Sequence, residues 1–118
     1  MVDDGHSVCI VRDLLEDERM LVHSVYFWLK PDLTDVQRAA FLHALSALKD
    51  VPGVTAFYLG TPASVPARPV VELSFDHSIT CVFENLAAHD AYQAHALHLA
   101  FLEVGRPLWS RVQIYDAD

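Results

Sequence analysis

Basic residues are scarce in this chain of 118 residues, where 8 lysines and arginines face 16 aspartates and glutamates, for a formal net charge of -8. Phosphate backbones are bound mainly through clusters of lysine and arginine, which the sequence lacks. Long apolar runs are also missing, since the uncharged stretch Ala91–Leu102 is 12 residues long and includes two histidines. Binding to nucleic acid and insertion into a membrane are therefore not expected.

Only two cysteines are present, Cys9 and Cys81, and they form no metal or redox motif. We therefore expect reduced thiols and a cytoplasmic protein. The short apolar run Val8–Val11 lacks the basic start and long core of a secretory signal. The sequence also lacks internal repeats, a GxSxG motif and an HExxH motif, so a repeat architecture, a serine hydrolase and a zinc hydrolase are not indicated.

Hydrophobic residues are abundant, at 53% of the chain, with a mean hydropathy of +0.22. A chain of this length forms one domain and leaves much of its surface in water, so such a composition favours association. Residues 1–19 differ from the rest, because they hold six acidic residues and two arginines. We expect them to form an extension with little apolar area to bury, free to be disordered, and residues 20–118 to form the domain.

The first strand and helix are predicted by clear local signals. Leu21–Lys30 is rich in aromatic and β-branched residues and stops at Pro31, which predicts a strand with two largely apolar faces. Thr34 and Gln37 form a capping-box pattern, and helical periodicity follows to about Asp50.

The rest of the chain predicts three strands and a two-part helix. The strands are Val54–Gly60, His77–Glu84 and Arg111–Asp116, and the prolines of 61–69 predict a loop that continues as an irregular strand over 70–75. Asn85 can cap a helix over 86–94, and after a bend a second helical piece runs on to Trp109.

This β-α-β-β-α-β order predicts an α+β, ferredoxin-like fold, with a four-stranded antiparallel sheet and its helices on one face. The first and third strands are apolar on the other face as well. We therefore expect a second copy to cover that face, giving a homodimer that approaches an α+β barrel.

Protonatable residues concentrate between His77 and His98. Tyr92, His95 and His98 recur at three-residue spacing, which places them on one side of a helix. His77 and His23 each lie on the apolar face of a predicted strand. Because every buried polar group needs a partner, the coincidence of His23, His77, Tyr92 and His98 predicts one small-molecule pocket.

Simpler explanations exist for each residue. A single histidine on an apolar face is more often a satisfied core residue than a catalyst, and a helix tyrosine can pack its ring while its hydroxyl reaches water. His95 and His98 have a spacing that suits a metal, but no third and fourth ligands accompany them, so no metal or cofactor is expected. Cys81 lies mid-strand without a base. The histidines predicted to lie on the surface are His6, His43 and His89.

The chain resembles the stress-responsive dimeric α/β-barrel (Dabb) family in five segments. They are VHSVYFWLKPDLT, VPGV, VFENLAAHDAYQAHALHLAF, RPLW and VQIYD, which span about residues 20–118, and AYQAHxxH is the most specific part. By similarity to the plant polyketide cyclases of this family, the resemblance implies acid–base chemistry on a polyketide-like or aromatic substrate. It implies catalytic roles for Tyr92 and His98, substrate contacts for His23 and His77, and a supporting role for Asp116 in orienting His98.

One position departs from the family pattern, which has a proline in HPxH where this chain has Ala96. Without that proline, a straighter helix is expected. The leading hypothesis is a cofactor-independent cyclase or lyase in which His98 removes a proton and Tyr92 donates to the developing enolate oxygen. Two alternatives stay open: a non-catalytic stress-response ligand-binding protein, and a monooxygenase, with or without haem, on the related dimeric barrel.

Overall fold

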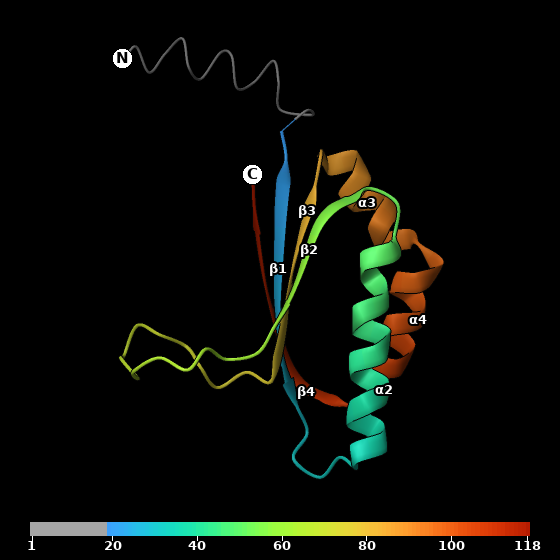
Figure 1. Ribbon diagram of the computed structural model, residues 1–118. Coiled ribbons are helices and arrows are strands. Elements are labelled where there is room, and N and C mark those ends of the chain that lie inside the picture. The colour runs from blue at the N-terminus through green and yellow to red at the C-terminus, as the bar shows by residue number, and fades with distance from the viewer. Residues whose placement is uncertain (1–18) are drawn as a thin grey trace, which may run out of the picture.

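The computed structural model describes residues 19–118, which form a four-stranded antiparallel sheet with helices on one face (Figure 1). The elements are β1 (Leu21–Leu29), α2 (Asp35–Ser46), the 3-10 helix η2 (Ala47–Asp50), β2 (Val54–Gly60), β3 (His77–Phe83), α3 (Leu86–Ala94), α4 (Ala96–Gly105) and β4 (Trp109–Ala117). The spatial order β2-β3-β1-β4 confirms the predicted ferredoxin-like fold.

Residues 1–18 lie outside the described part of the chain. They include the run Val8–Val11, His6, Cys9 and all of the predicted extension but Arg19. Within residues 19–118, no helix is both long enough and apolar enough to cross a bilayer.

β1 is a central strand, paired antiparallel on both sides. Its register with β3 sets His23 opposite Cys81 and Phe27 opposite His77. Its register with β4 sets His23 opposite Asp116. Every second residue of β1 is buried, as expected for a strand with one face under helices. The register therefore decides which side chains of three strands meet beneath the helices.

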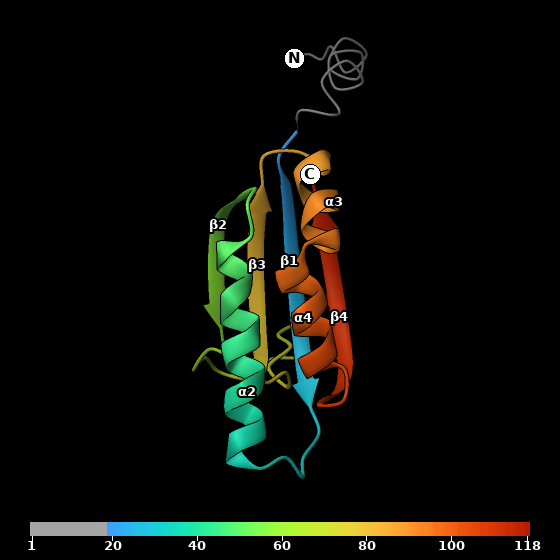
Figure 2. The same ribbon diagram turned by 90° about the vertical axis from the view of Figure 1, so that its right-hand side faces the viewer.

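The helices form a single layer, with α2 over β2 and β3 and α4 over β1 and β4 (Figure 2). Phe27, Phe41 and Phe101 join this layer to the sheet, with ring centroids 5.3 to 5.6 Å apart in edge-to-face contacts. Each such contact contributes about 0.5–1.5 kcal/mol beyond the burial of apolar area. The aromatic cluster fixes α2 and α4 against the central strand.

The chain breaks between α3 and α4 at His95, although no proline is present. His95 is extended, with φ -69° and ψ 146°, and its Nδ1 accepts a hydrogen bond from the Leu97 backbone N–H at 3.0 Å. The imidazole thus caps the N-terminus of α4, a position usually held by Ser, Thr, Asp or Asn. The predicted bend is confirmed. The straighter helix expected from Ala96 is wrong, because a side-chain cap ends the helix instead.

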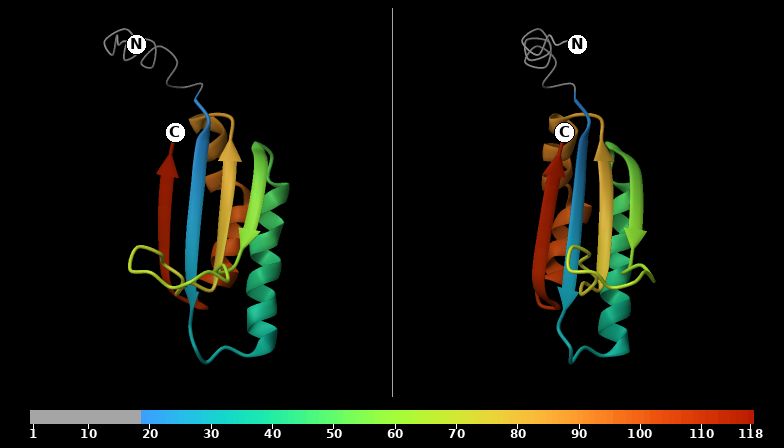
Figure 3. Two further views of the ribbon diagram at one scale, coloured as in Figure 1. Left: turned by 60° about the vertical axis from the view of Figure 1, so that its left-hand side comes forward. Right: turned by 90° about the vertical axis from the view of Figure 1, so that its left-hand side faces the viewer.

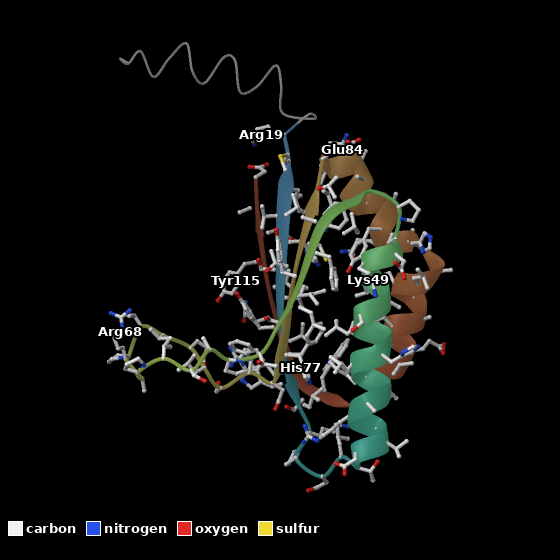
Figure 4. All side chains as sticks on the ribbon, in the orientation of Figure 1. Arg19, Lys49, Arg68, His77, Glu84 and Tyr115 are labelled. Atoms are coloured by element: carbon white, nitrogen blue, oxygen red, sulfur yellow. The ribbon has the colours of Figure 1, made fainter. Side chains whose placement is uncertain are left out.

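The other sheet face carries no helix within residues 19–118, and the loop over 61–76 projects from that side (Figures 1 and 3). Tyr26 and Trp28 lie on it, and Phe75 of the loop contacts both, with ring centroids 5.0 and 6.4 Å away. Tyr115 projects from the same face and is 61% exposed (Figure 4). Residues 70–75 form no strand, contrary to expectation. The sheet thus keeps an aromatic face that is only partly covered.

Thr34 caps α2 as its sequence pattern predicts, because its hydroxyl accepts from the Gln37 N–H at 3.1 Å while the Gln37 side chain accepts from the Thr34 N–H at 2.8 Å. Thr34→Ala should lower the free energy of unfolding by about 1 kcal/mol, since it leaves a helix donor without its partner. Urea denaturation measures this change. Thr61→Ala, in the exposed loop, is the control and should match the wild type. Equal stability of the two variants would contradict the contribution of the cap.

Candidate functional site

A cavity of about 230 Å³ lies between the sheet and the α3–α4 part of the helical layer. It is lined by His23, Val25, Phe27, Leu48, Ile79, Tyr92, Gln93, His98, Phe101, Leu102, Arg106, Trp109, Val112 and Ile114. Most of these side chains are apolar and at least partly buried. The three exposed ones are Gln93, Arg106 and Ile114, from α3, the end of α4 and β4. They mark the mouth of the cavity, beside the edge strand β4.

His23 brings a buried imidazole from β1 to this cavity, with only 3% of the residue exposed. Its Nδ1 lies 2.5 Å from Oδ1 of Asp116, directly opposite on β4. An ionised carboxylate can only accept, so Nδ1 carries the proton and Nε2 is the unprotonated nitrogen of the neutral ring. Burial lowers the pKa of His23, and the hydrogen bond and charge of Asp116 oppose that change. His23 is therefore a neutral base backed by a carboxylate.

His98 supplies a second imidazole from the first turn of α4. Its Nδ1 lies 3.1 Å from the backbone carbonyl oxygen of Gln93, which also can only accept, so Nε2 is again the unprotonated nitrogen. Burial lowers the pKa of His98, the hydrogen bond to Gln93 opposes this change, and the Arg106 guanidinium lowers the pKa further. A neutral ring at pH 7 follows.

Tyr92 comes from α3 and lies close to both imidazoles, with its ring centroid 5.9 Å from that of His23 and 4.8 Å from that of His98. Burial raises the pKa of Tyr92, and so does its hydrogen bond to the Cys81 thiol, to which the phenol donates. Burial likewise raises the pKa of Cys81 to about 11. The phenol is thus a proton donor beside two proton acceptors.

The structure brings three of the four predicted pocket residues together, namely His23, Tyr92 and His98, and leaves His77 out. The prediction that Asp116 orients His98 is wrong, because β4 pairs with β1 and sets the carboxylate against His23. A carboxylate–histidine pair exists in the site, but on the strand rather than on the helix.

His77 lies on the expected face of the sheet but is not among the residues that line the cavity, although its partner Phe27 is. It pairs with Phe27, four residues along β1 from His23, or about 13 Å at about 3.3 Å per residue. Figure 4 shows it at the loop end of β3, far from Glu84 at the other end. Its ring stacks on Phe41 of α2, with centroids 6.0 Å apart. His77 does not line this cavity, and its contact with a ligand stays a prediction.

Two neighbours of the site escaped the sequence analysis. His89 was expected on the surface, yet its ring centroid lies 5.2 Å from that of His23 and its side chain is 14% exposed. Its position one turn before Tyr92 is the signal that could have found it. Arg106 lines the cavity from the end of α4. The apolar periodicity of the helix does not predict that this charged residue faces the cavity. His95 caps α4, as described above, and does not line the cavity.

Three of the described residues could together approach a metal ion. Single ligand atoms of His23, His89 and Asp116 all lie within 4.8 Å of one another. Donor atoms around tetrahedral zinc stand about 3.4 Å apart, because each lies about 2.1 Å from the ion. The three groups would have to move closer to one another to bind such an ion. In their present positions they fit a hydrogen-bonded pair with a neighbouring imidazole better than a metal centre.

One known protein resembles this chain weakly in sequence, and several solved structures share its fold. Olivetolic acid cyclase of Cannabis sativa is 22% identical over 95 residues, which cover 80% of this chain and 91% of that protein. A dimeric ferredoxin-like protein from Thermobifida fusca superposes with a TM-score of 0.68 at 20% identity, covering 83% of this chain and 89% of the other. Hydroxynitrile lyase from Passiflora edulis superposes with a TM-score of 0.68 at 18% identity, covering 85% and 93%.

The sequence profile of the Stress responsive A/B Barrel Domain matches residues 21–118, from the first residue of β1 to the C-terminus. This match takes in every element of the sheet and all residues that line the cavity. The chain belongs to the stress-responsive A/B barrel (Dabb) family.

Proposed function

We propose that this protein is a homodimeric barrel that binds a small, largely apolar molecule and catalyses a cofactor-independent cyclisation or lyase reaction on a polyketide-like or aromatic substrate. One observation carries the proposal: two imidazoles with unprotonated Nε2 atoms and one protonated phenol meet in a cavity that is otherwise mainly apolar. Similarity to olivetolic acid cyclase supports chemistry of this kind, and the hydroxynitrile lyase is a lyase with the same fold.

In this mechanism His98 is the base. Its Nε2 accepts a proton from a carbon acid or a phenol of the substrate, while the Gln93 carbonyl holds Nδ1 and fixes the plane of the ring. Tyr92 turns its hydroxyl from the Cys81 thiol to the developing enolate oxygen and donates a hydrogen bond. A thiol is a weak acceptor, so this exchange costs little. One residue removes the proton and another stabilises the charge that results.

His23 contributes an acceptor on the strand side of the cavity. With Nδ1 bound to Asp116, its Nε2 can accept from a substrate hydroxyl and so orient the substrate. If a proton reaches His23, Asp116 stabilises the imidazolium, as the carboxylate of a catalytic triad does. The pair is therefore a second possible base, and the pH dependence of turnover distinguishes it from His98.

A non-catalytic ligand-binding protein is the alternative built on the same cavity. The apolar lining is sufficient for binding, whether or not a reaction follows. Saturable binding of a ligand that is recovered unchanged, with variants of His98 and Tyr92 that alter affinity alone, would favour this alternative.

The bare sheet face supports the dimeric part of the proposal. Val22, Tyr58 and Tyr115 lie on it and are 37%, 66% and 61% exposed. Such aromatic surface is usually covered by a partner, and a second copy can cover it through a two-fold contact. The Thermobifida fusca protein with this fold is dimeric.

Light scattering at micromolar concentration should give twice the chain mass of 13.2 kDa. Tyr115→Glu should shift the protein toward monomer, because it places a charge in the buried contact. Leu99→Glu, on the outer side of α4 and 51% exposed at that position, should stay dimeric. A wild-type monomer under these conditions would contradict the assembly.

His98→Ala should lower turnover of an identified substrate by about 100-fold or more, because general-base catalysis contributes about 100-fold to 10,000-fold. Tyr92→Phe should lower it by about 100-fold, through loss of one donor to the developing oxyanion. His43→Ala, at an exposed position of α2, is the control and should keep full activity. Steady-state kinetics measure turnover, and circular dichroism checks that each variant is folded. A His98→Ala variant that unfolds, yet binds ligand normally per folded molecule, would show a structural histidine instead.

The turnover rate should rise with pH through the pKa of the base, which burial holds below 6.5, and then level off. The sign follows because only the neutral imidazole accepts a proton. Asp116→Asn removes an effect that raises the pKa of His23, so it moves this limb to lower pH only if His23 is the base. With His98 as the base, the limb should stay in place. A clear acid shift in this variant would reassign the role to His23.

A further inference from the structure

We infer that Arg106 makes the cavity selective for amphipathic acids, holding a carboxylate or similar anion at the mouth while the apolar body of the ligand lies inside. The inference rests on the proposed function, because it names the class of molecule that the same cavity takes.

Arg106 is placed where such a group would enter. It is the C-cap of α4, it is exposed, and it is one of the residues that line the cavity. Within residues 19–118, no ion pair and no side-chain hydrogen bond uses its guanidinium. A guanidinium has five N–H donors in a planar fork that matches a carboxylate with two parallel hydrogen bonds. Its donors are thus available at the opening.

The wall behind Arg106 has the opposite character. Leu102, Trp109 and Val112 line the cavity there and are only partly exposed. A volume of 230 Å³ equals about eight waters at about 30 Å³ each, which suits a single-ring aromatic acid. The charged end of such an acid can stay partly hydrated at the mouth while its ring leaves water. The cavity therefore suits a ligand with a charged group at one end and an apolar body at the other.

The surroundings make Arg106 the source of any attraction for an anion. The chain has a net charge of -8, and the C-terminus of α4 carries partial negative charge from the helix dipole. Both repel a carboxylate. A cation at a helix C-terminus also stabilises the helix, which explains a basic residue at this position. It does not explain why the side chain lies on the cavity wall.

Arg106 also stands in a useful relation to the proposed base. It lies eight residues after His98, or about 12 Å along the helix axis at about 1.5 Å per residue. Side chains of a helix lean toward its N-terminus, so the long arginine side chain extends back toward His98. The guanidinium is near enough to lower the pKa of His98. An anion bound by Arg106 would therefore place the adjoining carbon atoms near the Nε2 atom.

The test compares two ligands of one size and different charge, phenylpropionate and phenylpropionamide, by isothermal titration calorimetry of the full chain. The acid should bind about fivefold to tenfold more tightly than the amide, as expected for one partly exposed charge-assisted contact. Arg106→Gln should bind both alike, and Arg106→Lys should keep part of the preference. Arg68→Gln, at the tip of the loop in Figure 4, is the matched control and should keep all of it. Added salt should weaken the preference.

The outcomes separate this inference from the proposed function. Equal binding of acid and amide by the wild type, or a preference that survives in Arg106→Gln, overturns the role of Arg106 and leaves the ligand cavity standing. Failure of both molecules to bind the wild type overturns the cavity proposal together with this inference. Circular dichroism checks that Arg106→Gln is folded, and the charge-retaining Arg106→Lys carries the comparison if it is not.

Discussion

The hydrogen bond between His23 and Asp116 is the contact on which the site depends. An imidazole buried without a partner would cost several kcal/mol, so a histidine on the central strand needs an acceptor within the sheet. The pairing of β4 with β1 supplies it, at 2.5 Å. A slip of one residue in that pairing would turn Asp116 to the other face and leave His23 unsatisfied. The same bond therefore helps to set the register and fixes the tautomer of a pocket residue.

The break at His95 gives the cavity its second polar wall. Tyr92 and His98 are six residues apart, and on one continuous helix such residues project about 120° apart. With α3 ended and α4 restarted by the His95 cap, their rings instead approach to 4.8 Å between centroids. A histidine that touches no part of the cavity thus makes the meeting of the other two possible. Its role is positional, and it replaces the proline of the family pattern.

The local features of the fold were predictable because they depend on short-range patterns. Alternation in β1, the capping box of α2 and the order of strands and helices all follow from neighbouring residues. Contacts between distant parts of the chain did not follow from such patterns. His77 shares a face with His23, but antiparallel pairing sets it about 13 Å away, and only the register gives that distance. Asp116 was assigned to the wrong histidine, because the register of β4 with β1 could not be read from the sequence.

The two faces of β1 link the cavity to the bare side of the sheet. His23 and Val25 point to the cavity. Ser24 and Tyr26, which alternate with them along β1, point to the opposite face, where we propose that a second copy packs. The second copy would pack against β1, the strand that sets His23 opposite Asp116. Catalytic groups need side chains held within a fraction of an ångström, and a strand packed on both faces meets that demand better than one packed on a single face. The proposed self-association would therefore affect the geometry of the site as well as bury apolar surface.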